Sequence, residues 1–212
     1  MTAKKKYQVF ISSTYEDLID ERACVTQTLL DVDCIPVGME QFPASNLSQM
    51  TYIEKVLEDC DYYILISAGR YGSTSEDGIS YTEKEYDYAL AHGIPVMCFL
   101  IKNIDEIPRG KCEKTEEGMK KLVTFREKVA KNKLVKYYES STELGKNVAI
   151  ALRHCINSFP ACGWIRGEKE DVASDFKAEI DKYLREHTMT QEDIDAMLAD
   201  TTFILDGGNA ES

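Results

Sequence analysis

Two carboxylates at the predicted start of one helix are the residues of this chain best suited to chemistry. Ser80 is a typical helix cap, and Glu83 and Glu85 follow it closely. A carboxylate can act as a covalent nucleophile or stabilise a cationic transition state. Each helical residue turns by about 100°, so Glu83 and Glu85 point about 200° apart. The two carboxylates are therefore expected on different faces of the helix.

Spacing favours different roles for these two acids. Ser80 and Glu83 have the spacing of a capping box, in which the Glu83 carboxylate folds back to the Ser80 amide. Glu85 shares its face with Tyr81 and Ala89, which lie four residues before and after it. Spacing leaves two interpretations of Glu85 open: a solvated helix glutamate or a catalytic carboxylate.

A glycine-bearing loop, Gly69-Arg70-Tyr71-Gly72, lies just upstream of this helix. Its glycines allow close approach of the backbone, which suits a tight turn as well as a bound ligand. Arg70 could clamp a phosphate through two hydrogen bonds or pair with an acid on the surface. The loop is therefore a candidate ligand site.

Further candidates follow the first two predicted strands. Ser12 and Ser13 end the first apolar run and could hydrogen-bond a ligand, and Met39 and Glu40 follow the second run. Ligands bind open parallel sheets beyond the carboxyl ends of the strands, where the strand order reverses. In the order 2-1-3-4-5, these residues would meet the glycine-bearing loop and the start of the Tyr81 helix at that edge.

Alternating strand and helix patterns supply the frame for this site. Apolar runs predict strands near residues 7–12, 35–38, 61–68, 95–101 and 134–138. Helical spacing and capping boxes predict helices near residues 13–30, 48–59, 80–92, 116–131 and 140–158. The first helix would start at the Ser13 to Glu16 capping box. We therefore expect an α/β, flavodoxin-like three-layer sandwich with a five-stranded parallel sheet.

Charge divides the chain into two parts. The net charge is −12, of which residues 168–212 carry −9 and the preceding residues −3. We expect an α/β domain over residues 1–167 and an acidic helical extension with a disordered end over residues 168–212. An acidic extension and a nearly neutral domain argue against binding of a phosphate backbone, which requires clustered Lys and Arg, so no nucleic-acid partner is expected.

Other classes of site find no support in the sequence. The seven cysteines are scattered without a Cys-x-x-Cys pair, which argues against a disulfide framework or a zinc site. His92, His154 and His187 lack the spacing of a catalytic triad or a metal site, and we expect no cofactor. No signal peptide and no apolar stretch of roughly 18 residues is visible, so a cytoplasmic protein without a membrane partner is expected.

Several stretches resemble a known bacterial family. They are Val9 to Leu18 with Glu21-Arg22, Pro36 to Phe42, Ser67 to Ser73, Ser80 to Ala89, and Gly93 to Val96. In these motifs the chain resembles domain-of-unknown-function family 4062. That family is similar to the Toll/interleukin-1 receptor (TIR) domains and the nucleoside 2-deoxyribosyltransferases.

The resemblance implies a TIR-like fold and a glutamate in the site. In the deoxyribosyltransferases, a glutamate opens a helix that runs into a Gly-x-Pro-Val strand. Counted back from Gly93, the matching position is Glu85, with Glu83 as the fallback. The implied activity is cleavage of the N-glycosidic bond of NAD or a related nucleotide, in bacterial anti-phage defence signalling.

In such an enzyme, Arg70 and the amides of the glycine-bearing loop would hold phosphates, and Tyr71 or Phe10 would stack on a base. The alternative is a non-catalytic interaction module whose partner is a second copy of the chain or another protein of the defence system.

Overall fold

The computed structural model of the chain describes residues 5–39, 49–132, 134–167 and 182. The chain divides into two units, Met1–Ile165 and Arg166–Ser212. The predicted helical extension over residues 168–212 lies outside the described residues, apart from Lys182. Among the described residues, no helix is long and apolar enough to cross a membrane.

Strands and helices alternate along the first unit. The strands are β1 (Gln8–Ser12), β2 (Ile35–Val37), β3 (Tyr62–Ser67), β4 (Val96–Ile101) and β5 (Val135–Tyr138). The helices are α1 (Ile19–Asp31), α2 (Gln49–Glu58), α3 (Tyr81–Ala91), α4 (Glu116–Asn132) and α5 (Ser141–Ser158). Two short 3-10 turns, η2 (Ile104–Glu106) and η3 (Arg109–Lys111), lie in the connection that follows β4.

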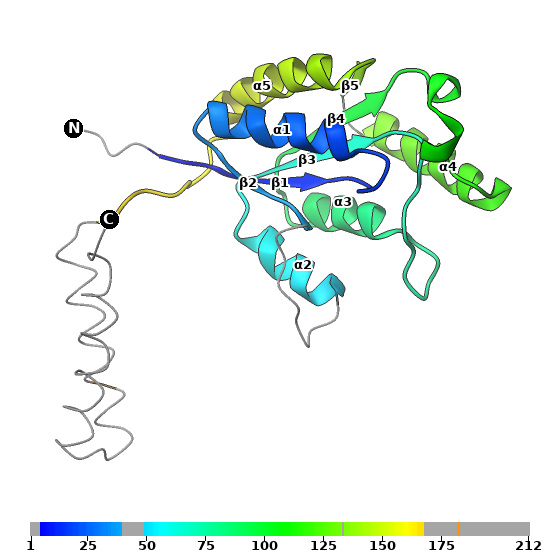
Figure 1. The fold of residues 1–212 in the computed structure, drawn as a ribbon. Helices are drawn as coiled ribbons and strands as arrows, with labels where there is room; N and C mark the ends of the chain where they lie inside the picture. The colour runs from blue at the N-terminus through cyan, green and yellow to red at the C-terminus, as the bar shows by residue number, and fades with distance from the viewer. Residues whose placement is uncertain (1–4, 40–48, 133, 168–181, 183–212) are drawn as a thin grey trace, which may run out of the picture. The chain divides into compact units, whose positions relative to one another are not determined.

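The five strands form one parallel sheet in the order β2-β1-β3-β4-β5 (Figure 1). The register places Phe10 beside Tyr63 and Tyr63 beside Val96. Strand order therefore reverses between β1 and β3, and the predicted α/β fold with its 2-1-3-4-5 sheet is confirmed.

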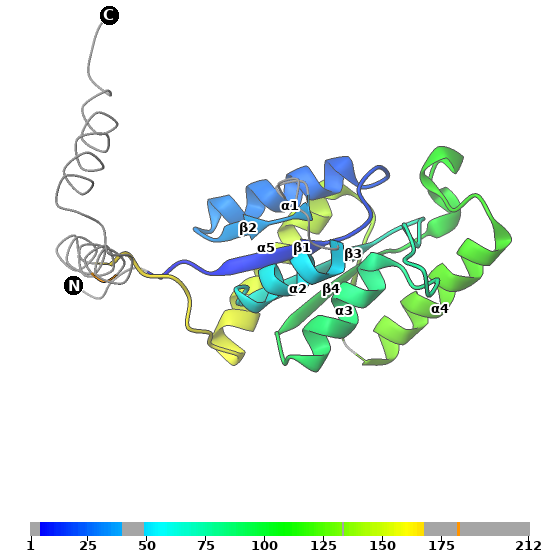
Figure 2. The same ribbon diagram turned by 90° about the horizontal axis from the view of Figure 1, so that it is seen from below.

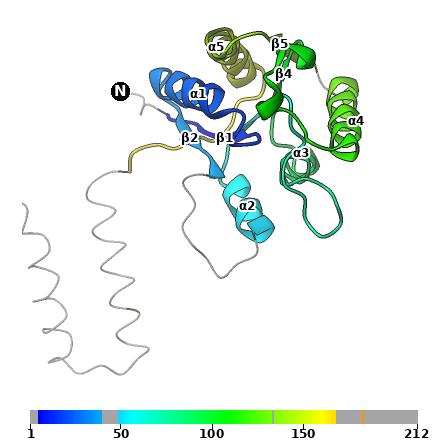
Figure 3. The ribbon, with the colours of Figure 1, turned by 45° about the vertical axis from the view of Figure 1, so that its right-hand side comes forward.

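Helices cover both faces of the sheet because its central strands are apolar on both sides (Figures 2 and 3). Neighbouring residues of a strand point to opposite faces. Val9 and Ile11 of β1 therefore pack in a core with residues of α1 and α5. Phe10 packs in a second core with residues of α2, α3 and α4. The result is a three-layer sandwich with two separate cores.

Helices α1 and α5 pack closely because α5 carries a glycine where the two helices meet. A Cβ atom on Gly145 would lie 2.8 Å from both Cys24 Sγ and Thr28 Oγ1 of α1. The Thr28 hydroxyl is held by a hydrogen bond to the Cys24 carbonyl at 2.8 Å. Any larger residue at position 145 would therefore push the two helices apart.

The predicted start of the first helix was wrong. Helix α1 begins at Ile19, its cap residue is Leu18, and no side chain caps it. The Ser13 hydroxyl instead accepts a hydrogen bond from the buried Arg22 guanidinium at 2.8 Å. Glu16, the other half of the predicted capping box, pairs with Arg70 at 2.7 Å. Both capping groups are thus engaged elsewhere, and residues 13–18 form a loop, the β1–α1 loop.

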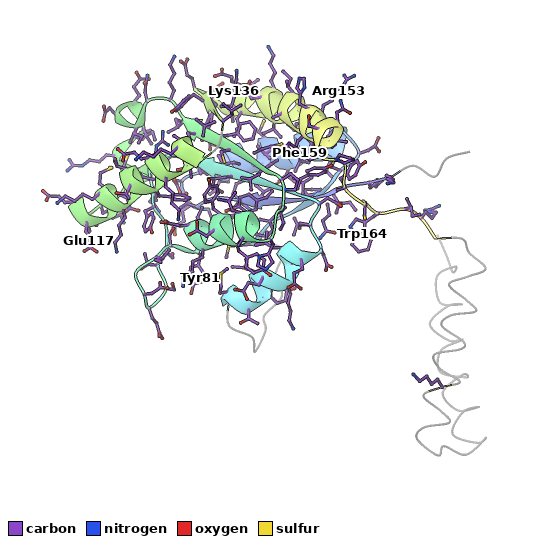
Figure 4. All side chains as sticks on the ribbon, turned by 180° about the vertical axis from the view of Figure 1, so that it is seen from behind. Tyr81, Glu117, Lys136, Arg153, Phe159 and Trp164 are labelled. Atoms are coloured by element: carbon purple, nitrogen blue, oxygen red, sulfur yellow. The ribbon has the colours of Figure 1, made fainter. Side chains whose placement is uncertain are left out.

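The chain leaves the first unit beside the point where it enters. Trp164 and Lys6 form an isolated antiparallel bridge. The Lys6 amide donates to the Trp164 carbonyl at 2.8 Å, and the Trp164 amide donates to the Lys6 carbonyl at 2.7 Å. Figure 4 shows Trp164 on the segment that follows α5, beyond Phe159. This bridge closes the unit next to the amino end of β1.

The variant Gly145→Ala tests the close packing of α1 and α5. Alanine is the better helix former by about 1 kcal/mol, but its Cβ would overlap Cys24 and Thr28. We expect a net loss of about 1–3 kcal/mol in the free energy of unfolding, measured with urea. Gly110→Ala is the control, because a Cβ there meets nothing within 4 Å. Equal stability of the two variants would contradict this packing.

Candidate active site

A cleft of about 780 Å³ opens at the carboxyl edge of the sheet. It is bordered by the β1–α1 loop, the loop between β3 and α3 (residues 68–80, the β3–α3 loop), the start of α3 and the connection after β4 (residues 102–115). The candidate site residues that line it are Ser13, Met39, Arg70, Gly72 and Tyr81. Glu40 lies outside the described residues.

Glu85 lies behind the wall of this cleft. Its side chain is only 1% exposed, on the face of α3 that packs against the sheet. The Ser12 hydroxyl at the end of β1 donates a hydrogen bond to Glu85 Oε2 at 2.5 Å. Within the described residues, Glu85 Oε1 has no hydrogen-bond partner. Glu85 is therefore a buried carboxyl group with one free acceptor, and not a solvated helix glutamate.

Burial raises the pKa of Glu85 from its ordinary 4.5 to about 7. The Ser12 hydrogen bond and the positive charge of Arg22 oppose this shift because both stabilise the carboxylate. The proton is therefore held weakly enough to be exchanged near neutral pH. Such a group suits acid, base or electrostatic catalysis.

Arg22 supplies the positive charge behind the cleft. It reaches back from α1 to the end of β1, where it donates to the Ile11 carbonyl at 3.2 Å and the Ser13 hydroxyl at 2.8 Å. Ser13 in turn donates to the Thr14 carbonyl at 2.7 Å. Ser12, which ends β1, and Ser13, which follows it, are thus held by different partners: Ser12 contacts Glu85, and Ser13 contacts Arg22.

Aromatic rings close the site on the sheet side. Phe10 stacks on Tyr63 with ring centroids 5.8 Å apart, and both side chains are fully buried. Burial, and next the negative charge of Glu85, raise the pKa of Tyr63 well above its ordinary 10. Its hydroxyl therefore stays protonated beside Ser12 and Glu85. Phe10 is a core residue in this structure and presents no free ring face to a base.

Glu83 takes a different place from the one its spacing predicts. Ser80 does cap α3, since its hydroxyl accepts from the Glu83 amide at 3.2 Å. The Glu83 carboxylate, however, reaches the Ser80 amide only through Tyr71. The Ser80 amide donates to the Tyr71 hydroxyl at 3.2 Å, and that hydroxyl donates to Glu83 Oε2 at 2.6 Å. Lys128 of α4 binds Glu83 Oε1 at 2.8 Å. Glu83 thus joins α3, α4 and the β3–α3 loop, which is a structural role.

The amides of the glycine-bearing loop already bind an anionic group of the protein. The Tyr71 amide donates to Glu113 Oε1 at 2.8 Å, and the Gly72 amide approaches the same oxygen at 3.4 Å. Arg70 binds Glu16 at 2.7 Å and the Gly110 carbonyl at 2.8 Å. Pairing with a surface acid, one of the two interpretations of Arg70, is therefore what the structure shows.

Two side chains absent from the sequence-based set border the site. Asp17 is only 3% exposed and lines the cleft, and burial raises its pKa against the opposing effect of the Thr14 hydroxyl. Glu113 comes from the polar connection after β4, where neither strand nor helix spacing marks it. Among the described residues, no group of three or more His, Cys, Asp or Glu could hold a metal ion.

Comparison with protein families gives one match. A family model described as Domain of unknown function (DUF4062) matches residues 8–153, which span β1 to most of α5. The match includes the Ser12–Glu85 pair, Arg70 and Glu113. No curated protein matches the chain.

The variant Glu85→Gln should make the stability less dependent on pH. Because the pKa of Glu85 is about 7 in the folded protein and 4.5 ordinarily, the folded state binds the proton more tightly. Its contribution to stability is present below about pH 4.5 and is lost as the pH rises to about 7. As the pH rises from 5 to 8, we expect the free energy of unfolding of Glu85→Gln to increase by about 2 kcal/mol relative to that of wild type, measured by urea unfolding.

Glu127→Gln, on the exposed face of α4, controls for the loss of one carboxylate. Parallel stability curves for wild type and Glu85→Gln would show that Glu85 is not a buried acid with a raised pKa.

The variant Tyr71→Phe tests the hydroxyl that connects Ser80 with Glu83. Without it, the buried Ser80 amide loses its hydrogen-bond partner, which should cost about 1–3 kcal/mol in the free energy of unfolding. Tyr88→Phe removes a comparable Tyr–Glu hydrogen bond, to Glu58, which is exposed to solvent. It should change the stability by less than about 0.5 kcal/mol. Equal losses in the two variants would contradict the role assigned to Tyr71.

Proposed function

The chain belongs to the family described as Domain of unknown function (DUF4062), and we propose that it cleaves the N-glycosidic bond of NAD or a related nucleotide. Glu85 is the catalytic carboxylate and Ser12 is the residue that positions it. By its resemblance to TIR domains, we place this activity in bacterial anti-phage defence signalling.

The observation that carries the proposal is the Ser12–Glu85 pair at the point where strand order reverses. Ligands of open parallel sheets bind at this point. Neighbours of the pair line the cleft: Ser13 follows Ser12, and Tyr81 and Thr82 lie one turn before Glu85. A buried carboxyl group with a raised pKa beside a cleft is typical of a functional site.

The chemistry suits a single carboxylate. When the bond between C1′ of the ribose and the base nitrogen breaks, its electron pair leaves with the base and C1′ becomes cationic. The ionised Glu85 carboxylate stabilises that cation, and the Ser12 hydroxyl keeps the carboxylate aimed by its hydrogen bond at 2.5 Å. A water oxygen then bonds to C1′ and loses its proton to solvent. Each product is a closed-shell molecule, so no further reactant is required.

Substrate can reach Glu85 only if the wall of the cleft moves, because the carboxyl group is 1% exposed. The proposal therefore includes a local opening between the β1–α1 loop and the start of α3. Closure over the ribose would keep bulk water from the cation.

Release of nicotinamide from NAD by the purified chain, followed by chromatography, tests the proposal. Wild type should turn over NAD at a rate that rises as Glu85 ionises, through about pH 7. Glu85→Gln should lose about a hundredfold or more in kcat. Glu83→Gln should keep most of the activity, because Glu83 is tied to Tyr71 and Lys128. Full activity of Glu85→Gln would overturn the assignment.

A second candidate is a non-catalytic interaction module, and the complete burial of Glu85 favours it. Tyr15 lines the cleft, and Ile19 is the first residue of α1; both side chains are exposed, and a partner could cover them. Native mass spectrometry together with the NAD assay separates the two functions. An oligomer or complex that shows no turnover at any pH supports the module, and turnover by a monomer removes it.

A further inference from the structure

Two successive backbone amides of the β3–α3 loop converge on one carboxylate oxygen. The Tyr71 and Gly72 amides lie 2.8 and 3.4 Å from Glu113 Oε1. Gly72 has a φ of +97°, a backbone conformation that glycine adopts more readily than other residues. Successive amides arranged in this way form a concave site for anions.

The carboxylate that fills this site comes from the connection after β4. The Glu113 amide donates to the Gly69 carbonyl at 2.8 Å, and Arg70 donates to the Gly110 carbonyl at 2.8 Å. On its other side, Glu113 Oε2 lies only 2.5 Å from the position that a Cβ atom of Gly118 would occupy. Two hydrogen bonds thus hold the connection against the β3–α3 loop, and the missing side chain of Gly118 in α4 leaves room for the Glu113 carboxylate.

The surroundings of these amides suit a phosphate. Gly72, Arg70 and Lys114 line the cleft, so its wall offers an amide and two cationic side chains. The hydroxyl-bearing Thr14 and Thr82 lie on the same wall. Glu16, Asp17 and Glu113 also line the cleft, and of these three acidic residues Glu113 is the one hydrogen-bonded to the amides.

We infer that the Tyr71 and Gly72 amides bind the diphosphate group of a nucleotide, and that Glu113 blocks this subsite until it moves away. This inference rests on the proposed function, because that function names a nucleotide as the substrate. Phosphate and Glu113 compete for the same two amides, so the connection after β4 must move away before the nucleotide binds. Arg70 is released from the Gly110 carbonyl by the same movement and becomes available to the phosphate.

The competition has a measurable size. For a ligand that binds only when Glu113 has left, the apparent affinity equals the intrinsic affinity multiplied by the fraction of molecules in which the amides are open. If that fraction is about one tenth, removing Glu113 from the amides tightens binding about tenfold. A glutamine at this position lacks the charge that makes the carboxylate the stronger acceptor.

Isothermal titration of the full chain with ADP-ribose tests the inference through two variants. Glu113→Gln removes the charge of the competing group. Gly118→Ala leaves every charge in place, but its Cβ would overlap Glu113 Oε2 and so displace the carboxylate whose Oε1 lies on the amides. It also favours α4 because alanine is the better helix former. Both variants should bind ADP-ribose and inorganic pyrophosphate about tenfold more tightly than wild type, and adenosine no more tightly.

Two matched controls distinguish the displacement of Glu113 from a general effect of a lost charge or of an added Cβ atom. Glu117→Gln removes a neighbouring carboxylate that pairs with Lys121 and projects from the start of α4 (Figure 4). Gly110→Ala adds a Cβ in open space on the same connection. Both controls should bind ADP-ribose as wild type does.

Unchanged affinity for ADP-ribose in Glu113→Gln and Gly118→Ala would overturn the inference, and so would equal tightening in Glu117→Gln. Tighter binding of pyrophosphate without tighter binding of ADP-ribose would overturn the assignment to a nucleotide. The measurement needs no turnover. If binding tightens while NAD is not cleaved, the subsite stands and the proposed reaction fails. If NAD is cleaved with unchanged affinities, this inference fails and the proposed function stands.

Discussion

The rest of the site depends on one hydrogen bond between two buried groups, Ser12 and Glu85. A carboxyl group that is buried away from water needs a hydrogen-bond partner, because its burial without one costs free energy. Ser12 is the last residue of β1, and Glu85 lies in the second turn of α3. Their contact at 2.5 Å therefore fixes where α3 sits on the sheet edge. Tyr81 and Thr82, which line the cleft from α3, lie one turn before Glu85.

The β3–α3 loop is shaped by groups that are distant in the sequence. Tyr71 places its hydroxyl between Ser80 and Glu83, and its amide faces Glu113. Lys128 then ties Glu83 to α4. The loop has hydrogen bonds of its own between Ser75, Asp77 and Ile79. Its Tyr71 end, in contrast, is held by groups of α3 and of the connection after β4. A change in any of these elements would be transmitted to the cleft.

The sequence was informative about the frame and much less so about the site. The parallel sheet was predictable from strands that alternate with helices, and its order from the doubly wound arrangement that five such strands favour. The continuous apolar runs of β3 and β4 indicated helices on both faces. The burial of Glu85 could not be read from α3, since spacing does not tell which face meets the sheet. The start of α1 was misplaced because Arg22, nine residues on, takes the Ser13 hydroxyl. Glu113 was missed because its partners lie 41 and 42 residues away.

The bridge between Lys6 and Trp164 has a mechanical consequence. Because the two segments run antiparallel, a pull on the residues that flank the unit opens their two hydrogen bonds one after the other, like a zipper. Strand β1 lies between β2 and β3 and resists the same force in shear. The closing segment can therefore peel away under tension while β1, and with it Ser12, stays in the sheet. A force applied at the amino end of β1 would therefore leave the strands in register at the carboxyl edge of the sheet.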